Sequence, residues 1–338
     1  MANPDRALTA LEWLANASIP TRGHSLLWPS YRFTPPAAQG LDAAQLDAFI
    51  RDHFADELNH TRGQCYQWDV INEPYSNYDV QVDGLLGNQS IVEYYKLAQQ
   101  LAPGVPLFLN DFGILAGYDT IHCNYTTTYI QWLVDQGAPV HGLGLQSHFS
   151  QGPVDMEEMW NRIQLFASIP IQKLAVTEFD LAVLDQELLA DFTRDFMTLV
   201  FSCDKFDEFL VWGFWAGAHW LPDAAMFAAN WTAKPNALAY ADLVFNQWWT
   251  CHTHLETDTR GCVEVLAFKG WLVVELTNGT LVQSREIDKG AAQSLSVEAL
   301  RLPWAVASPD DNVSSASGLV SSVMVVAGAV RSALVMLL

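Results

Sequence analysis

The sequence predicts an α/β fold in which parallel strands alternate with covering helices, as in a β/α barrel. Apolar strand-like runs alternate with amphipathic segments from about residue 19 to residue 248, a pattern typical of a parallel sheet that is covered by helices. Polar or aromatic residues recur where the runs end, and a barrel places its active site at that edge. A doubly wound sheet usually shows a glycine-rich phosphate turn, and we find no such turn in the sequence.

The elements follow from the spacing of apolar residues. Leu46, Ile50, Phe54 and Leu58 recur every four positions and predict one face of a helix. Asn3-Pro4 is a suitable cap and first turn for the opening helix. The predicted helices cover residues 5–16, 42–59, 91–101, 121–136, 156–167, 186–201 and 235–248. The predicted strands cover residues 19–28, 65–73, 106–111, 140–148, 171–178 and 208–215.

The pattern changes after Trp249. Residues 261–268, 270–277 and 280–283 predict short antiparallel strands, with Asn278-Gly279 as a hairpin turn. The sequence therefore predicts four regions: a barrel over residues 1–249, a small β appendage over 250–303, a linker over 304–317, and a hydrophobic tail over 318–338.

Charge and aromatic content restrict the partners. The chain carries 17 basic and 38 acidic residues, a net charge of −21, which argues against nucleic acid or an anionic membrane surface as a partner. It also contains 13 tryptophans. Indole rings fill cores, but they also stack on the C–H faces of sugar rings.

Cysteines and sequons indicate the compartment. The five cysteines show no CxxC spacing and no metal-ligand pattern. Cys251 and Cys262 flank a polar segment, so a local disulfide is expected if the compartment is oxidising. Asn-x-Ser/Thr sequons occur at Asn16, Asn59, Asn88, Asn124, Asn230, Asn278 and Asn312. Chance would give fewer, which favours a secretory route.

The two ends of the chain differ. Residues 1–20 show no basic segment followed by an apolar one, so no signal peptide is visible. Residues 318–338 are predominantly apolar, and they predict either a membrane anchor or the removable signal for a glycolipid anchor, with attachment near residues 314–318. Arg331 argues against a spanning helix, so the glycolipid signal is preferred. We expect a secreted or cell-surface protein.

Two glutamates stand at the ends of predicted strands. Glu73 ends the run Trp68–Asn72 and is followed by Pro74, and Glu178 ends a second run of the same design. Glycoside hydrolysis needs two carboxyl groups, one to protonate the leaving oxygen and one to attack or to activate water. The pair predicts this chemistry, with no metal or organic cofactor.

Six strand-end segments together resemble glycoside hydrolase family 10, the β/α-barrel endo-1,4-β-xylanases. The segments occur in the family's order, and the last one together with the β appendage resembles the eukaryotic, plant-like branch. They are RGHSLLW (22–28), WDVINEP (68–74), LFLNDFG (107–113), GLGLQSHF (142–149), AVTEFDL (175–181) and VWGFWAGAHW (211–220).

The resemblance implies a role for each matched residue. Glu73 matches the acid/base and Glu178 the nucleophile of a retaining mechanism. His148 and Asp180 match a pair that orients the nucleophile. The residues that match sugar ligands and subsite walls are His24, Trp28, Asn72, Gln146, Trp212 and Trp220. The expected partner is xylan or a related β-1,4-glycan, bound by a monomer.

The resemblance also implies eight strands, whereas six are predicted here. Two further units do not fit into the 21 residues before Arg22, so we expect a barrel that lacks its first two strands, in a chain truncated at its N-terminus. This expectation keeps an alternative open: an inactive or weakly active cell-surface remnant that binds glycans. A third interpretation, a different barrel glucanase, is disfavoured by the QSHF and TEFD segments.

Overall fold

The computed structural model describes residues 4–82, 87–117, 119–150, 152–255, 270–276, 281–287 and 323–328. The chain forms two compact units, one that extends to Ala239 and one that spans Tyr240–Val330. The division lies within helix α8 (Pro235–Asp242), ahead of the boundary at Trp249 that the sequence predicted.

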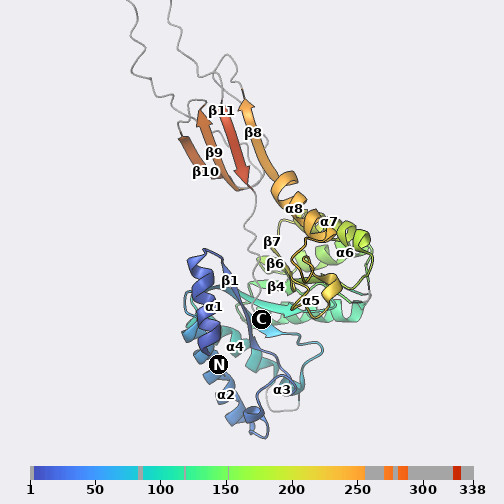
Figure 1. Ribbon diagram of the computed structural model, residues 1–338. Helices are drawn as coiled ribbons and strands as arrows, with labels where there is room; N and C mark the ends of the chain where they lie inside the picture. Colours follow the sequence, from blue (N-terminus) through green and yellow to red (C-terminus); the bar gives the residue numbers. More distant parts are fainter. Residues whose placement is uncertain are drawn as a thin grey trace, which may run out of the picture. The chain divides into compact units, whose positions relative to one another are not determined.

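The first unit is built on a curved sheet of parallel strands in the order β1-β2-β3-β4-β6, with β7 paired to β6 (Figure 1). The main strands are β1 (Thr21–Leu27), β2 (Cys65–Asn72), β3 (Leu107–Asp111), β4 (Gly142–Leu145), β6 (Lys173–Leu181) and β7 (Phe206–Val211). Among the described residues β1 pairs only with β2, and β7 pairs only with β6. The parallel strands confirm the barrel-type α/β fold that the sequence predicts.

The sequence did not predict the short helix α3 (Asp79–Val82). The other helices of the first unit lie where the apolar spacing predicted them, and several pack against the strands: α2 on β1, α4 on β2 and β3, and α7 on β7. The helices are α1 (Pro4–Asn16), α2 (Ala43–His60), α3 (Asp79–Val82), α4 (Asn88–Leu101), α5 (Thr120–Asp135), α6 (Met156–Ala167) and α7 (Gln186–Phe201). Four of them begin at an aspartate whose carboxylate accepts hydrogen bonds from N–H groups of the first turn, the usual N-cap. These caps are Asp42, Asp119, Asp155 and Asp185.

Two predicted strands and one predicted helix are shorter than expected, and the differences affect the site. The run 140–148 is interrupted after Leu145, and strand β5 (His148–Phe149) follows as a separate segment beside β6. Ser147 has a φ of 65° there, which strand geometry does not allow. The strand predicted over 208–215 ends at Val211, so Trp212 lies in the following loop. The helix predicted over 235–248 changes to π-helical turns at Leu243.

The second unit contains a four-stranded antiparallel sheet in the order β10-β9-β11-β8 (Figure 1). The strands are β8 (Trp249–Leu255), β9 (Gly270–Leu276), β10 (Leu281–Ile287) and β11 (Val323–Gly328). The predicted strand 261–268, the Asn278-Gly279 turn, the linker and the Cys251–Cys262 disulfide lie outside the described residues or side chains. Part of the predicted tail forms β11 between β9 and β8, rather than standing apart from the appendage. None of the helices in the described part of the chain is long and apolar enough to cross a membrane.

Candidate active site

The candidate site lies at the carboxyl edge of the first unit's sheet. Glu73 follows the last residue of β2, and its φ of 55° turns the chain sharply out of the strand. Such a left-handed backbone is uncommon for a residue with a side chain. The Glu73 N–H donates to the carbonyl of Asn110 on β3, at 2.8 Å, which fixes the turn against the neighbouring strand. Pro74 comes next and lacks a donor with which to continue the sheet.

The Glu73 carboxylate is held by three side-chain amides. Gln146 donates to Oε1 at 3.0 Å, Asn72 to the same oxygen at 3.4 Å, and Asn77 to Oε2 at 3.0 Å. Burial raises the pKa of Glu73, and the negative charges of Asp111 and Glu178 raise it further, whereas the hydrogen bond from Gln146 opposes the rise. A carboxyl group with a raised pKa retains its proton to higher pH and can act as a general acid.

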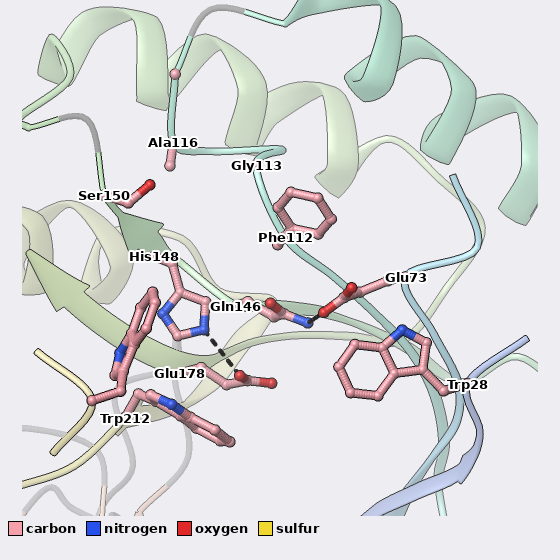
Figure 2. Close-up of a pocket in the computed structure, with 12 residues that line it drawn as sticks. Trp28, Glu73, Phe112, Gly113, Ala116, Gln146, His148, Ser150, Glu178 and Trp212 are labelled. Atoms are coloured by element: carbon pink, nitrogen blue, oxygen red, sulfur yellow. Dashed lines mark hydrogen bonds and ion pairs between the residues drawn. The ribbon is translucent and has the colours of Figure 1, made fainter. Parts of the chain in front are cut away.

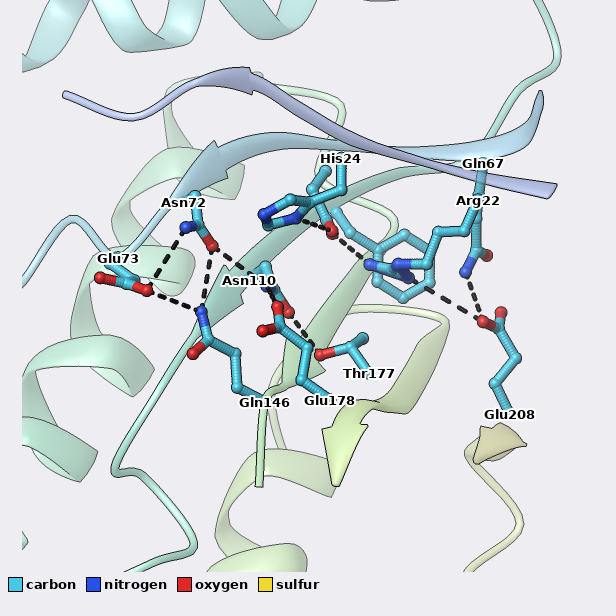
Figure 3. A network of polar contacts seen from close by, with 12 residues as sticks. Arg22, His24, Gln67, Asn72, Glu73, Asn110, Gln146, Thr177, Glu178 and Glu208 are labelled. Atoms are coloured by element: carbon cyan, nitrogen blue, oxygen red, sulfur yellow. Dashed lines mark hydrogen bonds and ion pairs between the residues drawn. The ribbon is translucent and has the colours of Figure 1, made fainter. Parts of the chain in front are cut away.

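Glu178 lies within strand β6 and is 5% exposed. Asn110 donates from Nδ2 to Oε1 of Glu178 at 2.8 Å and to Oδ1 of Asn72 at 3.0 Å. Because Asn72 in turn donates to Glu73, a continuous chain of hydrogen bonds joins the two carboxylates (Figure 3). Thr177 donates to Oδ1 of Asn110 at 2.7 Å and fixes the orientation of this amide.

His148 lies between two carboxylates. Its Nε2 is 3.0 Å from Oε2 of Glu178, and its Nδ1 is 3.0 Å from Oδ1 of Asp180. Burial alone would lower the pKa of His148, but the hydrogen bonds to Asp180 and Glu178 outweigh it and raise the pKa to about 9. The imidazole is therefore protonated near neutral pH and can donate to both carboxylates. The indole of Trp220 donates to the other oxygen of Asp180 at 2.6 Å.

Glu73 and Glu178 face one cleft of about 470 Å³ (Figure 2). Trp28 lies near Glu73, and His148 lies beside Glu178 (Figure 2). Of the ten residues that the sequence singled out, seven line the cleft: Trp28, Glu73, Gln146, His148, Glu178, Trp212 and Trp220. The loop after β3 adds lining residues that the sequence did not select: Phe112, Gly113, Ala116 and Gly117.

The other three selected residues do not line the cleft. Asn72 and Asp180 are buried and act through the hydrogen bonds described above. The His24 side chain is 31% exposed, and its Nδ1 lies 3.0 Å from Oδ2 of Asp69. Burial lowers the pKa of His24, but the hydrogen bond that its ring donates to Asp69 and the negative charge of Asp69 outweigh this effect and raise the pKa. Asp69 also binds Arg22, which extends the network toward Glu208 (Figure 3).

Several residues that support the site were not selected as site residues from the sequence. Asn110 bridges Asn72 to Glu178, and Asn77 binds Glu73. Asp111 is completely buried, lies 3.0 Å from Nε2 of His122, and has its pKa raised by burial. Polar residues at the end of an apolar strand, as in LFLNDFG, were the available signal. Which neighbour each one binds depends on the register between strands.

Among the described residues, no group of three or more His, Cys, Asp and Glu side chains could hold a metal ion. The chemistry available at the cleft is that of two carboxyl groups, one with a raised pKa and one beside a protonated histidine. Paired carboxyl groups of this kind cleave glycosidic bonds. A parallel barrel-type sheet with such a pair at its carboxyl edge belongs to the class of β/α-barrel glycoside hydrolases.

The family follows from comparison with known proteins. The profile described as Glycosyl hydrolase family 10 matches residues 3–243, and the chain belongs to this family. It is 30% identical over 179 residues to endo-1,4-beta-xylanase B of Paenibacillus barcinonensis, covering 50% of this chain and 53% of that protein. It is 26% identical over 270 residues to endo-1,4-beta-xylanase 1 of Arabidopsis thaliana, covering 79% of this chain and 28% of that protein. The chain thus spans about half of the first relative and a smaller share of the second.

The fold agrees with that of solved structures. Native xylanase 10B from Thermotoga maritima superposes with a TM-score of 0.63 at 20% sequence identity, covering 72% of this chain and 81% of that one. The six segments that suggested the family in the sequence lie within the part that the family profile matches.

Proposed function

We propose that this chain is an endo-1,4-β-xylanase that hydrolyses internal β-1,4 bonds of xylan by a retaining double displacement. The observation that carries the proposal is the hydrogen-bonded chain from Glu73 through Asn72 and Asn110 to Glu178, at the wall of a single cleft. This chain of hydrogen bonds positions two carboxyl groups against the same substrate: Glu73, whose pKa is raised, and Glu178, which lies beside the protonated His148. The relatives named endo-1,4-beta-xylanase support the choice of polysaccharide.

In the first step Glu73 protonates the leaving oxygen while Glu178 attacks the anomeric carbon. The glycosidic C–O bond breaks, and a glycosyl ester forms on Glu178. In the second step Glu73, now ionised, takes a proton from water while the water oxygen attacks the anomeric carbon; the bond between that carbon and Glu178 breaks, and the Glu178 carboxylate is regenerated. Burial and two neighbouring carboxylates favour the protonated form of Glu73 in the first step. When the ester forms, Glu178 loses its negative charge. This loss lowers the pKa of Glu73 and favours its ionised form in the second step.

His148 and Asp180 position the nucleophile in this proposal. The protonated imidazole binds one oxygen of Glu178, and Asn110 binds the other, so the carboxylate is oriented before the substrate arrives. The tryptophans at the cleft, Trp28, Trp212 and Trp220, supply flat faces for sugar rings. Gln146 at the cleft lining and the partly exposed His24 supply polar groups for sugar hydroxyls, whereas the buried Asn72 acts through its hydrogen bonds to Glu73 and Gln146.

Substitution of each glutamate tests the assignment. Glu178→Ala is expected to abolish the release of reducing ends from xylan. Glu73→Ala is expected to lose activity on xylan but to retain the first step on an activated aryl xyloside, seen as rapid release of the aryl alcohol, because a good leaving group needs no proton. Proton NMR of the first-formed anomer gives the stereochemistry. Equal loss of both substrates in Glu73→Ala, or a product of inverted configuration, would contradict the mechanism.

A second candidate function is glycan binding with little or no turnover. One observation favours it: among the described residues, β1 and β7 each pair with one neighbour, so no described strand closes the sheet between them. A cleft that is open on this side holds the sugar less firmly. Xylan pull-down combined with a reducing-end assay separates the two candidates, since binding without product supports this one.

We also propose that the protein is secreted or displayed at the cell surface. Five of the predicted sequons fall where side chains are described, and all five asparagines are exposed: Asn16, Asn59, Asn88, Asn124 and Asn230. Exposed sequon asparagines are what a glycoprotein requires. A mobility shift after enzymatic removal of N-glycans from the protein made in a eukaryotic host tests the proposal. Attachment through residues 318–338 stays a prediction, which release by phosphatidylinositol-specific phospholipase C would check.

A further inference from the structure

Two tryptophans outside the cleft lining form a stacked pair, in which Trp231 is exposed and Trp215 is half-buried. The indoles of Trp215 and Trp231 stack with ring centroids 5.1 Å apart and an angle of 7° between their planes. Trp231 is 57% exposed, and neither residue lines the cleft. Large exposed apolar side chains that are also ordered often mark binding surfaces.

The backbone at Trp231 is unusual. Its φ of 68° lies in the left-handed region, which bulky L-residues rarely adopt. The turn that carries it is closed by hydrogen bonds from the Trp231 N–H to the Ala228 carbonyl at 2.8 Å and from the Ala228 N–H to the Thr232 carbonyl at 2.9 Å. The turn therefore holds the indole in one position, where its ring contacts Phe214 and Phe227 as well as Trp215, although the residue is more than half exposed.

Trp215 is fixed to the same turn. Its indole Nε1 donates to the carbonyl of Ala229 at 3.1 Å. Its backbone forms a bridge with Phe227, which pairs in turn with Ala233 across the turn. Both rings are thus attached to one short, hydrogen-bonded segment, and the pair presents a rigid surface.

Packing alone does not account for this arrangement. A residue that served only to cover Trp215 would need neither an indole that is more than half exposed nor a left-handed backbone. A rigid flat indole suits the C–H face of a pyranose ring, because stacking then needs little reordering of side chains. The net charge of −21 disfavours anionic polymers at this surface, whereas an uncharged polysaccharide meets no repulsion.

The position along the chain also favours a polysaccharide. Trp212 and Trp220 line the cleft and belong to the same loop as Trp215. Trp215 comes three positions after Trp212, so their Cα atoms lie within about 11 Å of each other. One polysaccharide chain can therefore reach both the cleft and the pair.

We infer that Trp215 and Trp231 form a second sugar-binding platform, outside the cleft, which stacks on a pyranose ring of the xylan main chain. The inference rests on the proposed function for its substrate class. The platform holds long or insoluble xylan near the cleft, and short oligosaccharides that fill only the cleft do not use it.

Binding to insoluble xylan tests the platform. The parent for this experiment is the full chain with Glu178→Ala, so that the polymer is not consumed, and Trp231→Gly is added to it. Glycine suits the positive φ, so this variant removes the indole without straining the turn, and an unchanged thermal midpoint confirms that it folds. We expect the dissociation constant to rise about 2- to 10-fold, as the loss of one aromatic contact predicts. Trp13→Ala, which removes an indole that is 65% exposed on α1, should bind like the parent.

Two further measurements complete the test. In the active chain, Trp231→Gly should leave kcat/KM for a short xylo-oligosaccharide unchanged and lower it for insoluble xylan. Asn230 starts a sequon, and Thr232→Ala removes this sequon but keeps the backbone N–H that donates to Asn230 at 3.1 Å. The Thr232→Ala variant should bind xylan as tightly as the parent. Equal xylan binding by parent and Trp231→Gly, or loss of binding in Thr232→Ala, overturns the platform. Failure of the wild-type chain to release reducing ends counts instead against the proposed function.

Discussion

The side-chain amide of Gln146 donates a hydrogen bond of 3.0 Å to the carboxylate of Glu73, although the two residues follow different strands. The same Nε2 also lies 3.2 Å from Oδ1 of Asn72. The resemblance to the family implied a sugar ligand at Gln146. The contact with Glu73 gives it a second role, because a donor to the ionised carboxylate opposes the rise in the pKa of Glu73 that burial causes.

Gln146→Leu is therefore expected to move the alkaline limb of the pH profile to higher pH. A general acid must carry its proton, so activity falls as the pH rises through the pKa of Glu73. Without the amide donor that pKa is higher, and activity persists to higher pH even as kcat/KM decreases through lost sugar contacts. The pH dependence of kcat/KM on soluble xylan measures the shift. A limb that moves to lower pH would exclude this role for Gln146.

Asp111→Asn should move the same limb in the opposite direction. The buried charge of Asp111 raises the pKa of Glu73, although less than burial does, and a neutral amide removes this contribution. Thr126→Val is the matched control, because it removes a 3.4 Å hydrogen bond to Asp111 but leaves the charge in place. If both variants shift the limb equally, the effect comes from packing rather than from the charge.

His148 should make the stability of the first unit depend on pH. The folded pKa of His148 is about 9, above the ordinary value of about 6.5, so this contribution is complete below about pH 6.5 and is lost as the pH rises through about 9. The shift corresponds to at most about 3 kcal/mol. Denaturant unfolding at several pH values should show a decline over this interval that is absent in His148→Asn. Parallel declines in both proteins would refute the assignment.

Arg22→Ala is expected to lower the free energy of unfolding by about 3–5 kcal/mol, because it leaves buried carboxylates without their cation. The side chains of Arg22, Asp69 and Glu208 are 6%, 1% and 8% exposed. Arg194 pairs with Asp191 and Asp195 at the surface, so Arg194→Ala should change stability by less than about 1 kcal/mol. Urea unfolding of the three proteins measures the difference. Similar losses in both variants would show that the Arg22 pairs contribute no more than surface pairs.

The order of the elements was predictable from the sequence, because apolar spacing reports which face of each segment is buried. The repeat of Leu46, Ile50, Phe54 and Leu58 predicted α2, and all four are buried. The ends of elements were less predictable. The interruption at Ser147 and the end of β7 at Val211 depend on backbone turns and strand pairing that no local pattern encodes.

The identities of the two glutamates were likewise available from the sequence, because strand-end motifs in a fixed order identify a family. The sequence by itself thus determined the fold class, the family resemblance and the candidate pair Glu73 and Glu178. Only the tertiary structure decided what surrounds them: Asn110 between the two carboxylates, His148 between Glu178 and Asp180, and Trp231 on Trp215. The contacts of Asn110 and His148 join residues on different strands, and the contact between Trp215 and Trp231 joins two parts of the segment between β7 and α8. The register of the strands sets the distances between the strand residues, and the burial of each group affects its pKa. Local composition determines only which elements form.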